Sequence, residues 1–201
     1  MAAPPSALYP LVRALLREAS VLGPDDDALS VFRVDLGTGD RAIVSSSAPM
    51  SGRGAGPSLQ DTRGIAMDGG RLFVGLRAMR NFTVVEIDLA SGDRTVVADA
   101  NRGSGTTTFS ITGFDIEGGI GYLAGSRDYL LRFDLSTGDR TIVSGPGLGT
   151  GPVLGNLSGL TVQGTNAYSS VTQMQSIVRF DLTDGTRTLL SERLIGDGPR
   201  T

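Results

Sequence analysis

One short sequence motif occurs four times in the chain, at intervals of about 50 residues. It has the form Asp-Leu-x-x-Gly-x-Arg, and the four copies lie at 35–41, 88–94, 134–140 and 181–187. A second motif starts at Gly64, Gly113 and Gly159 and keeps nearly the same interval. Because two separate motifs share one period, the chain is predicted to fold as a series of similar structural units.

Each repeat unit contains four short runs that are typical of β-strands, separated by Gly, Asp and Ser. Four strands in about 45 residues, followed by a glycine-rich connection, are typical of one blade of a β-propeller. The repeats do not show the period of about 3.6 residues that a helical solenoid would have. The sequence therefore predicts an all-β fold, a partial β-propeller of three to four blades made of four-stranded antiparallel sheets. The predicted units are residues 20–45, 64–98, 113–144 and 159–191.

The motif Asp-Leu-x-x-Gly-x-Arg is predicted to form a tight hairpin turn in every unit. We expect its glycine, at position 39, 92, 138 or 185, to have a positive φ, and its leading Asp to accept hydrogen bonds from the N–H groups of the turn. The Asp-Arg pairs that follow at 40–41, 93–94 and 139–140 are expected to be exposed charges on outer strands. Such charges contribute little to stability.

The two ends of the chain differ from the repeats. Residues 1–19 are predicted to form an N-terminal tail with a short helix over about 7–19, since the apolar residues from Leu8 to Leu16 follow the spacing of one helix face. Residues 20–201 are predicted to form the propeller repeat domain. Residues 196–201 match the links that precede other units, so the chain is also interpreted as a piece of a longer propeller protein.

Composition excludes several classes of function. The 201 residues have a formal net charge of −3 and a pI of about 4.9, so we expect neither a nucleic-acid nor a membrane partner. The chain has no histidine and no cysteine, which removes the commonest general base and the usual zinc ligands. The N-terminus lacks the basic region of a signal peptide. A cytoplasmic location is expected for the chain as given, and a secreted or periplasmic one if the N-terminus is truncated.

The repeats resemble the blades of six-bladed β-propellers of the NHL and SMP-30 (gluconolactonase)-like kind. Those blades often read Gly-Ile-Ala-x-Asp, then Leu-x-Val, and residues 64–68 and 72–74 have this form. The later Asp-x-x-Thr-Gly is matched at 134–138. The resemblance extends over roughly residues 20–199 and implies the propeller architecture. The metal ligands of gluconolactonase-like enzymes have no matching positions, so the resemblance does not imply their activity.

The first predicted strand of each unit is the innermost one, where a propeller would hold a central site. There the units differ at corresponding positions, and three carboxylates occur: Asp68, Asp115 and Glu117. Asp115 and Glu117 are the candidate catalytic residues, and all three are candidate metal ligands. Ordinary sequence drift at strand ends would produce the same differences between units, so these differences are compatible with a site and with its absence. The glycine-rich segments at 51–56, 101–105 and 145–151 precede strands rather than helices, so they are interpreted as links between blades and not as nucleotide-binding loops.

Two functions remain open from the sequence. The first is a non-catalytic binding or scaffold module for a protein or small ligand, without a cofactor. The alternative is a lactonase-like hydrolase or lyase with a carboxylate site in the central channel, for which a divalent metal could be needed. Three or four blades would also leave the faces of the first and last sheets uncovered, so self-association through these faces is expected.

Overall fold

The computed structural model describes residues 19–21, 29–49, 52–78, 81–106, 110–125 and 129–191. The first blade contains β1 (Ala19–Val21), β2 (Ser30–Val34) and β3 (Arg41–Ser46). The second contains β4 (Thr62–Asp68), β5 (Arg71–Ala78), β6 (Asn81–Ile87) and β7 (Arg94–Ala98). The third contains β8 (Ile111–Glu117), β9 (Ile120–Gly125), β10 (Leu130–Asp134) and β11 (Arg140–Ser144). The fourth contains β12 (Leu157–Gln163), β13 (Asn166–Val171), β14 (Ser176–Asp181) and β15 (Arg187–Ser191), with a 3-10 turn, η1, at Thr172–Met174.

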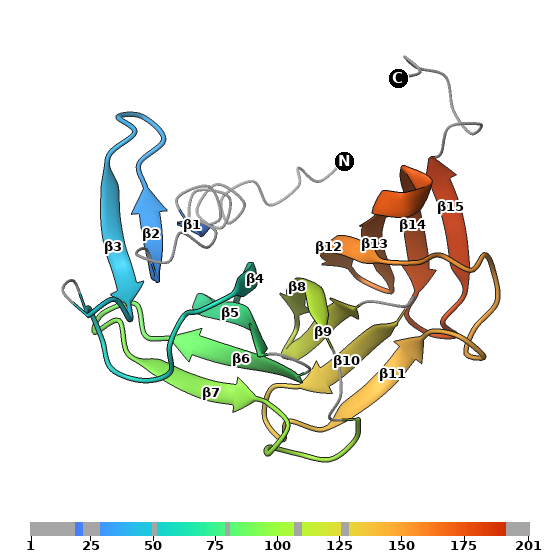
Figure 1. Ribbon diagram of the computed structural model, residues 1–201, viewed down its shortest axis with the longest axis horizontal. Coiled ribbons are helices and arrows are strands. Elements are labelled where there is room, and N and C mark those ends of the chain that lie inside the picture. The colour runs from blue at the N-terminus through green and yellow to red at the C-terminus, as the bar shows by residue number, and fades with distance from the viewer. Residues whose placement is uncertain are drawn as a thin grey trace, which may run out of the picture.

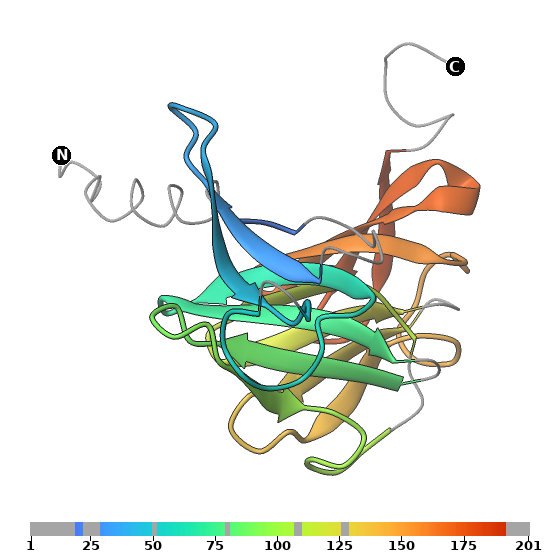
Figure 2. The same cartoon turned by 60° about the vertical axis from the view of Figure 1, so that its left-hand side comes forward.

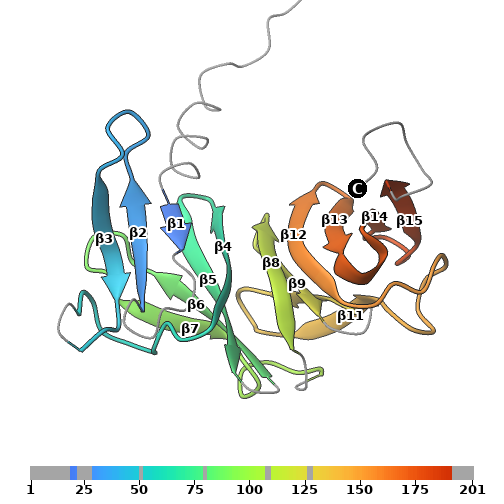
Figure 3. The ribbon, with the colours of Figure 1, turned by 45° about the horizontal axis from the view of Figure 1, so that its top comes forward.

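The four blades follow one another round an open arc, and β1, β4, β8 and β12 lie on its inner side (Figures 1 and 3). Within each blade the strands pair in chain order and antiparallel; three sheets have four strands, and the described part of the first has three. The predicted all-β class and partial propeller architecture are confirmed.

The helix predicted over 7–19 lies almost entirely outside the described residues. Its last residue, Ala19, begins β1 and pairs with Arg33 of β2, so any helix must end earlier. Over the ranges that the structure describes, no helix has the length and apolar character needed to cross a membrane.

Apolar side chains from neighbouring blades form a separate core at each junction. Between the second and third blades, Phe73, Phe82 and Phe133 are fully buried and belong to one cluster. A second cluster joins the first blade to the second, and a third joins the third blade to the fourth. Each blade is therefore stabilised by its neighbours, as expected for a repeat protein in which one sheet cannot bury both of its faces alone.

The repeated motif forms the hairpin turn before the outermost strand of each blade, as predicted. The glycines at 39, 92, 138 and 185 have φ of 79, 83, 79 and 76°, values that only glycine adopts without strain. The leading aspartates cap the turns: Asp35 Oδ1 accepts from the N–H groups of Gly37 and Thr38 at 2.8 and 2.9 Å. Asp88, Asp134 and Asp181 accept equivalent bonds in the other blades.

The arginine at the end of the motif connects successive blades. In the second, third and fourth blades this residue, Arg94, Arg140 or Arg187, is only 6, 5 or 8% exposed. Each guanidinium lies against the link from the preceding blade, namely residues 52–57, 99–106 and 145–152. We call each of these arginines, together with the link that it binds, an arginine clamp.

The acceptors in each clamp are neutral oxygens, most of them carbonyl oxygens of the link. Arg140 donates to the carbonyl oxygens of Asp99 at 2.7 Å and Thr106 at 2.9 Å. Its backbone N–H donates to the Ser104 carbonyl at 2.8 Å. In return, the Asp139 carboxylate accepts the N–H and the hydroxyl of Ser104 at 2.7 and 2.8 Å. The buried charge is therefore compensated by peptide dipoles, and the link is held from both sides.

Glycine is required in the link because the backbone of the link nearly touches the backbone of the repeated turn in the next blade. A Cβ built on Gly149 would lie 2.0 Å from the Gly185 carbonyl oxygen, and one on Gly151 would lie 2.2 Å from that of Arg187. The glycine-rich segments are thus links between blades, as predicted, and their glycines permit the clamp.

The expectation that the Asp-Arg pairs are exposed charges of little consequence is wrong for Arg94 and Arg140. The aspartates Asp93 and Asp139 are exposed, but both bind a link N–H. Only the first pair, Asp40 and Arg41, is exposed as expected. Sequence reasoning failed because the arginine is buried by the preceding blade and not by its own strand.

Replacing Arg140 by alanine is expected to lower the free energy of unfolding by about 3 kcal/mol, because it removes a buried side chain and leaves several part-buried link carbonyls without donors. The matched control is Arg132→Ala, which removes an exposed arginine from the adjacent strand β10 and should change stability by less than about 0.5 kcal/mol. Urea denaturation followed by circular dichroism measures both. Equal losses in the two variants would contradict the clamp.

Acid is expected to destabilise the protein through its turn aspartates. Hydrogen bonds from the Ser136 hydroxyl, the Thr137 N–H and the Ser136 N–H lower the pKa of Asp134, and similar bonds lower the pKa of Asp35, Asp88 and Asp181. These carboxyls bind protons more tightly when unfolded. Their stabilisation is therefore complete well above the unfolded pKa of about 3.9 and is lost as the pH falls through it and below.

The variant Asp134→Asn keeps an acceptor oxygen in the turn but does not titrate. Its free energy of unfolding should fall less steeply than that of the wild type as the pH decreases from about 5 to 3. Denaturant unfolding at a series of pH values provides the comparison, and identical slopes would show that the turn carboxyl is not a source of the acid sensitivity.

Candidate functional site

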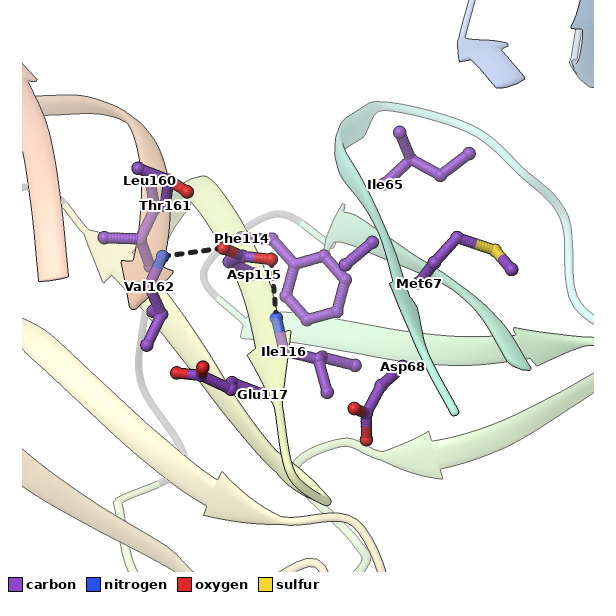
Figure 4. A pocket seen from close by; sticks show the side chains of 11 residues that line it. Ile65, Met67, Asp68, Phe114, Asp115, Ile116, Glu117, Leu160, Thr161 and Val162 are labelled. Carbon is purple, nitrogen blue, oxygen red and sulfur yellow. Dashed lines mark hydrogen bonds between the residues drawn. The ribbon is translucent and has the colours of Figure 1, made fainter. Parts of the chain in front are cut away.

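The inner strands β4, β8 and β12 lie side by side and line one pocket (Figure 4). The second sequence motif places a glycine, Gly64, Gly113 or Gly159, in each of these strands, and this lets their backbones approach closely. A Cβ on Gly113 would lie 2.5 Å from the carbonyl carbon of Gly159. The pocket has a volume of about 450 Å³ and is lined by residues 65–68, 114–117 and 160–162. All three candidate carboxylates, Asp68, Asp115 and Glu117, lie in this lining.

Asp68 ends β4 and binds the next blade. Its two carboxylate oxygens accept the N–H groups of Gly118 and Gly119, at 3.2 and 2.8 Å, in the hairpin between β8 and β9. Glu117 ends β8 and does the same one blade further on, where its Oε2 accepts the Gly164 N–H at 2.8 Å. Two of the three candidates therefore hold neighbouring blades together at the inner edge.

Asp115, like Asp68, is half-buried, whereas Glu117 is exposed. Its Oδ1 accepts the N–H of Ile116 at 2.8 Å, and its Oδ2 accepts the N–H of Val162 on β12 at 2.7 Å (Figure 4). Burial raises the pKa of this carboxyl, although the two backbone hydrogen bonds act in the opposite direction. Asp115 is thus a partly desolvated acid fixed between two blades.

Sequence comparison of the repeats located the carboxylates but not the apolar part of the pocket. Ile65, Met67, Leu160 and Val162 are half-buried and surround the acidic positions. Met67 packs against the core between the first and second blades and also lines the pocket. The signal for these residues is the alternation of apolar and polar side chains along each inner strand, such as Met67 beside Asp68 and Leu160 and Val162 on either side of Thr161.

Among the residues that the structure describes, no three acidic side chains are grouped closely enough to hold a metal. The assignment of Asp115 and Glu117 as catalytic residues, and of all three carboxylates as metal ligands, stays a prediction.

The fold has counterparts among solved structures. No protein-family model matches the sequence, and no curated protein does. A chain from the crystal structure of a nidogen/laminin complex aligns with a TM-score of 0.59 at 14% identity, over 80% of this chain and 54% of that one. A structural genomics protein of unknown function from Bacteroides thetaiotaomicron aligns with a TM-score of 0.58 at 17% identity, over 92% of this chain and 44% of that one.

These likenesses concern the fold alone. With the four consecutive sheets, they define the chain as a β-propeller-like protein. It spans about half the length of each of the two chains that it matches. Membership of the NHL or SMP-30-like group stays a prediction.

Asp68→Ala is expected to destabilise the fold by about 1 kcal/mol, since it leaves the N–H groups of Gly118 and Gly119 without their acceptor. Gln163→Ala is the matched control: Gln163 occupies the same position in the fourth blade, where the described chain provides no next hairpin. Its effect should stay below about 0.5 kcal/mol. Thermal unfolding at neutral pH compares them, and an equal or larger loss for Gln163→Ala would refute the proposed role of Asp68 between blades.

Proposed function

We propose that this chain is a propeller module that binds a ligand at its inner strands and does not catalyse a reaction. The observation that carries the proposal is the use of the pocket carboxylates: Asp68, Asp115 and Glu117 each accept backbone N–H groups of a neighbouring blade. A carboxylate held in this way is oriented by the fold. It serves better as a fixed acceptor than as a group that must move a proton in each turnover.

The residue types around the pocket support binding. Among side chains, histidine is the most frequent general base in enzymes, and cysteine and lysine are frequent nucleophiles. The chain contains no histidine or cysteine, and all 18 of its basic residues are arginines. Arginine stays protonated and cannot act as a base. The proposed module therefore works without a cofactor.

The pocket chemistry indicates the class of ligand. Half-buried apolar side chains such as Met67 and Leu160 offer contact area, and Asp115 offers an acceptor in a partly desolvated place. A carboxylate of that kind gains most from a partner that donates hydrogen bonds or carries positive charge. We infer that the ligand has an apolar body and an amine or amide donor, as a small molecule or as a protein side chain. The structural neighbour named as a nidogen/laminin complex gives the protein ligand some support by analogy.

Phenethylamine and its uncharged analogue phenethyl alcohol test the binding proposal. The amine should perturb the NMR signals of the Met67 methyl group more than the alcohol does, and Asp115→Asn should remove this difference. Asp184→Asn, which changes an exposed turn carboxyl in the fourth blade, is the control and should leave it unchanged. Equal responses to amine and alcohol in the wild type would contradict the assigned role of Asp115.

The enzyme alternative is tested separately with small lactones in the presence of Ca²⁺ or Mg²⁺. We expect no hydrolysis above the background rate, and no rise in the unfolding temperature when either ion is added. Lactone hydrolysis that is lost in Asp115→Asn and Glu117→Gln would establish the hydrolase instead.

A further inference from the structure

The first blade carries the arginine motif, but none of the described residues occupies the place that the link takes beside this motif in the other blades. Gly39 has the same φ as Gly138, 79°, so the turn has the same shape. Yet Arg41 is exposed, whereas Arg94, Arg140 and Arg187 are buried. Within the described ranges the Arg41 guanidinium makes no hydrogen bond or ion pair.

The turn glycines show the same contrast. A Cβ on Gly92 would lie 2.6 Å from the Val44 carbonyl oxygen of the preceding blade, and one on Gly185 would lie 2.3 Å from that of Val143. A Cβ on Gly39 would meet nothing within 4 Å. Figures 1 and 2 both show the β2–β3 turn projecting freely from the arc. The first blade thus presents a complete clamp surface, formed by Gly39, Asp40 and Arg41, and no link from the described part of the chain lies in it.

The apolar side chains beside this surface are also less covered than their counterparts. Phe32 corresponds in register to Leu131 and Val178, which are 0% exposed because they pack against the preceding blade. Phe32 is only half-buried. The side of the first blade that bears Phe32 and Arg41 therefore has the chemistry of a junction between blades.

The fourth blade presents the other side of such a junction, the side that faces the following blade in the rest of the arc. Ile177 and Leu190 are 47 and 43% exposed, whereas Leu130, the counterpart of Ile177, is fully buried against the fourth blade. Ser191 at the end of β15 is exposed as well. Its counterpart Ser144 is buried, donates to the Gly185 carbonyl at 2.7 Å and accepts from Arg187 at 3.1 Å.

The sequence after Ser191 repeats that of a link. Residues 195–199 read Ile-Gly-Asp-Gly-Pro, and the third link reads Leu-Gly-Thr-Gly-Pro at 148–152. In the third link the two glycines permit the backbone contact, and the carbonyl oxygens of Leu148 and Pro152 accept from Arg187 at 3.2 and 3.0 Å. The same chemistry is therefore encoded at 195–199.

We propose that two copies of this chain associate head to tail, with residues 195–199 of each copy bound in the clamp surface of the other. Arg41 donates to the carbonyl oxygens of the incoming segment, Asp40 accepts an N–H from it, and Ile177 of one copy packs beside Phe32 of the other. In Figure 1, β3 and β15 lie at opposite ends of the arc, which makes a second copy the natural occupant.

The residue between the two link glycines differs in an informative way. In the first link this residue is Ala55, which lies opposite Asp93, and in the second it is Ser104, which lies opposite Asp139. In the segment 195–199 it is Asp197, which would lie opposite Asp40. Two carboxylates in an exposed place repel each other weakly. Asp197→Ser, which restores the pairing seen between Ser104 and Asp139, should therefore tighten the association at neutral pH. The proposal does not depend on the ligand assigned to the pocket.

Sedimentation equilibrium over a range of protein concentrations tests the association. The wild type should show a reversible monomer–dimer equilibrium. Arg41→Ala and Gly198→Val should each weaken it by roughly tenfold to a hundredfold, the first by removing charged hydrogen bonds and the second by blocking backbone contact. Arg33→Ala, which removes another exposed arginine of the first blade, is the matched control and should leave the dissociation constant unchanged.

The outcomes separate clearly. Weakening by Arg41→Ala and Gly198→Val, with tightening by Asp197→Ser, supports the head-to-tail clamp. A wild-type protein that stays monomeric at all concentrations overturns the proposal. A dimer whose dissociation constant is unchanged in both Arg41→Ala and Gly198→Val also overturns it. So does a dimer that Arg33→Ala weakens as much as Arg41→Ala does. Circular dichroism and the unfolding midpoint of each variant at a concentration where it is monomeric identify any variant that fails to fold. Because Arg41 is exposed and unbonded, Arg41→Ala is expected to retain the monomer's stability.

Discussion

The arginine clamp is the interaction on which the rest of the structure depends. A guanidinium that is 5% exposed, such as that of Arg140, would be costly to bury alone, and here it is compensated by link carbonyls rather than by a carboxylate. Those carbonyls converge on it only when the link runs tightly round the edge of the next blade. The clamp therefore sets how each blade follows the one before it, and the apolar cores form between blades placed in this way.

The inner edge of the arc uses a second set of contacts for the same purpose. Asp68 and Glu117 bind the hairpin of the following blade, so the second–third and third–fourth junctions are each held by an arginine outside and by a carboxylate inside. The pocket lies where three such blades meet.

The candidate site was only partly predictable. Alignment of the repeats showed where Asp68, Asp115 and Glu117 lie on the inner strands, because period and strand order are local properties. The partners of these carboxylates could not be found in the same way. They are backbone N–H groups, at Gly118, Gly164 and similar positions, and a backbone donor carries no side-chain signature.

The sequence by itself determined the repeat, the strands and the turns, since a positive φ at Gly138 and a capping carboxylate at Asp134 depend on residues only a few positions apart. Only the tertiary structure decided the fate of the arginines. Arg41 and Arg140 follow the same motif, yet one is exposed and the other is buried. The difference arises because burial depends on whether a link from another blade covers the side chain, and that link lies far away in the sequence.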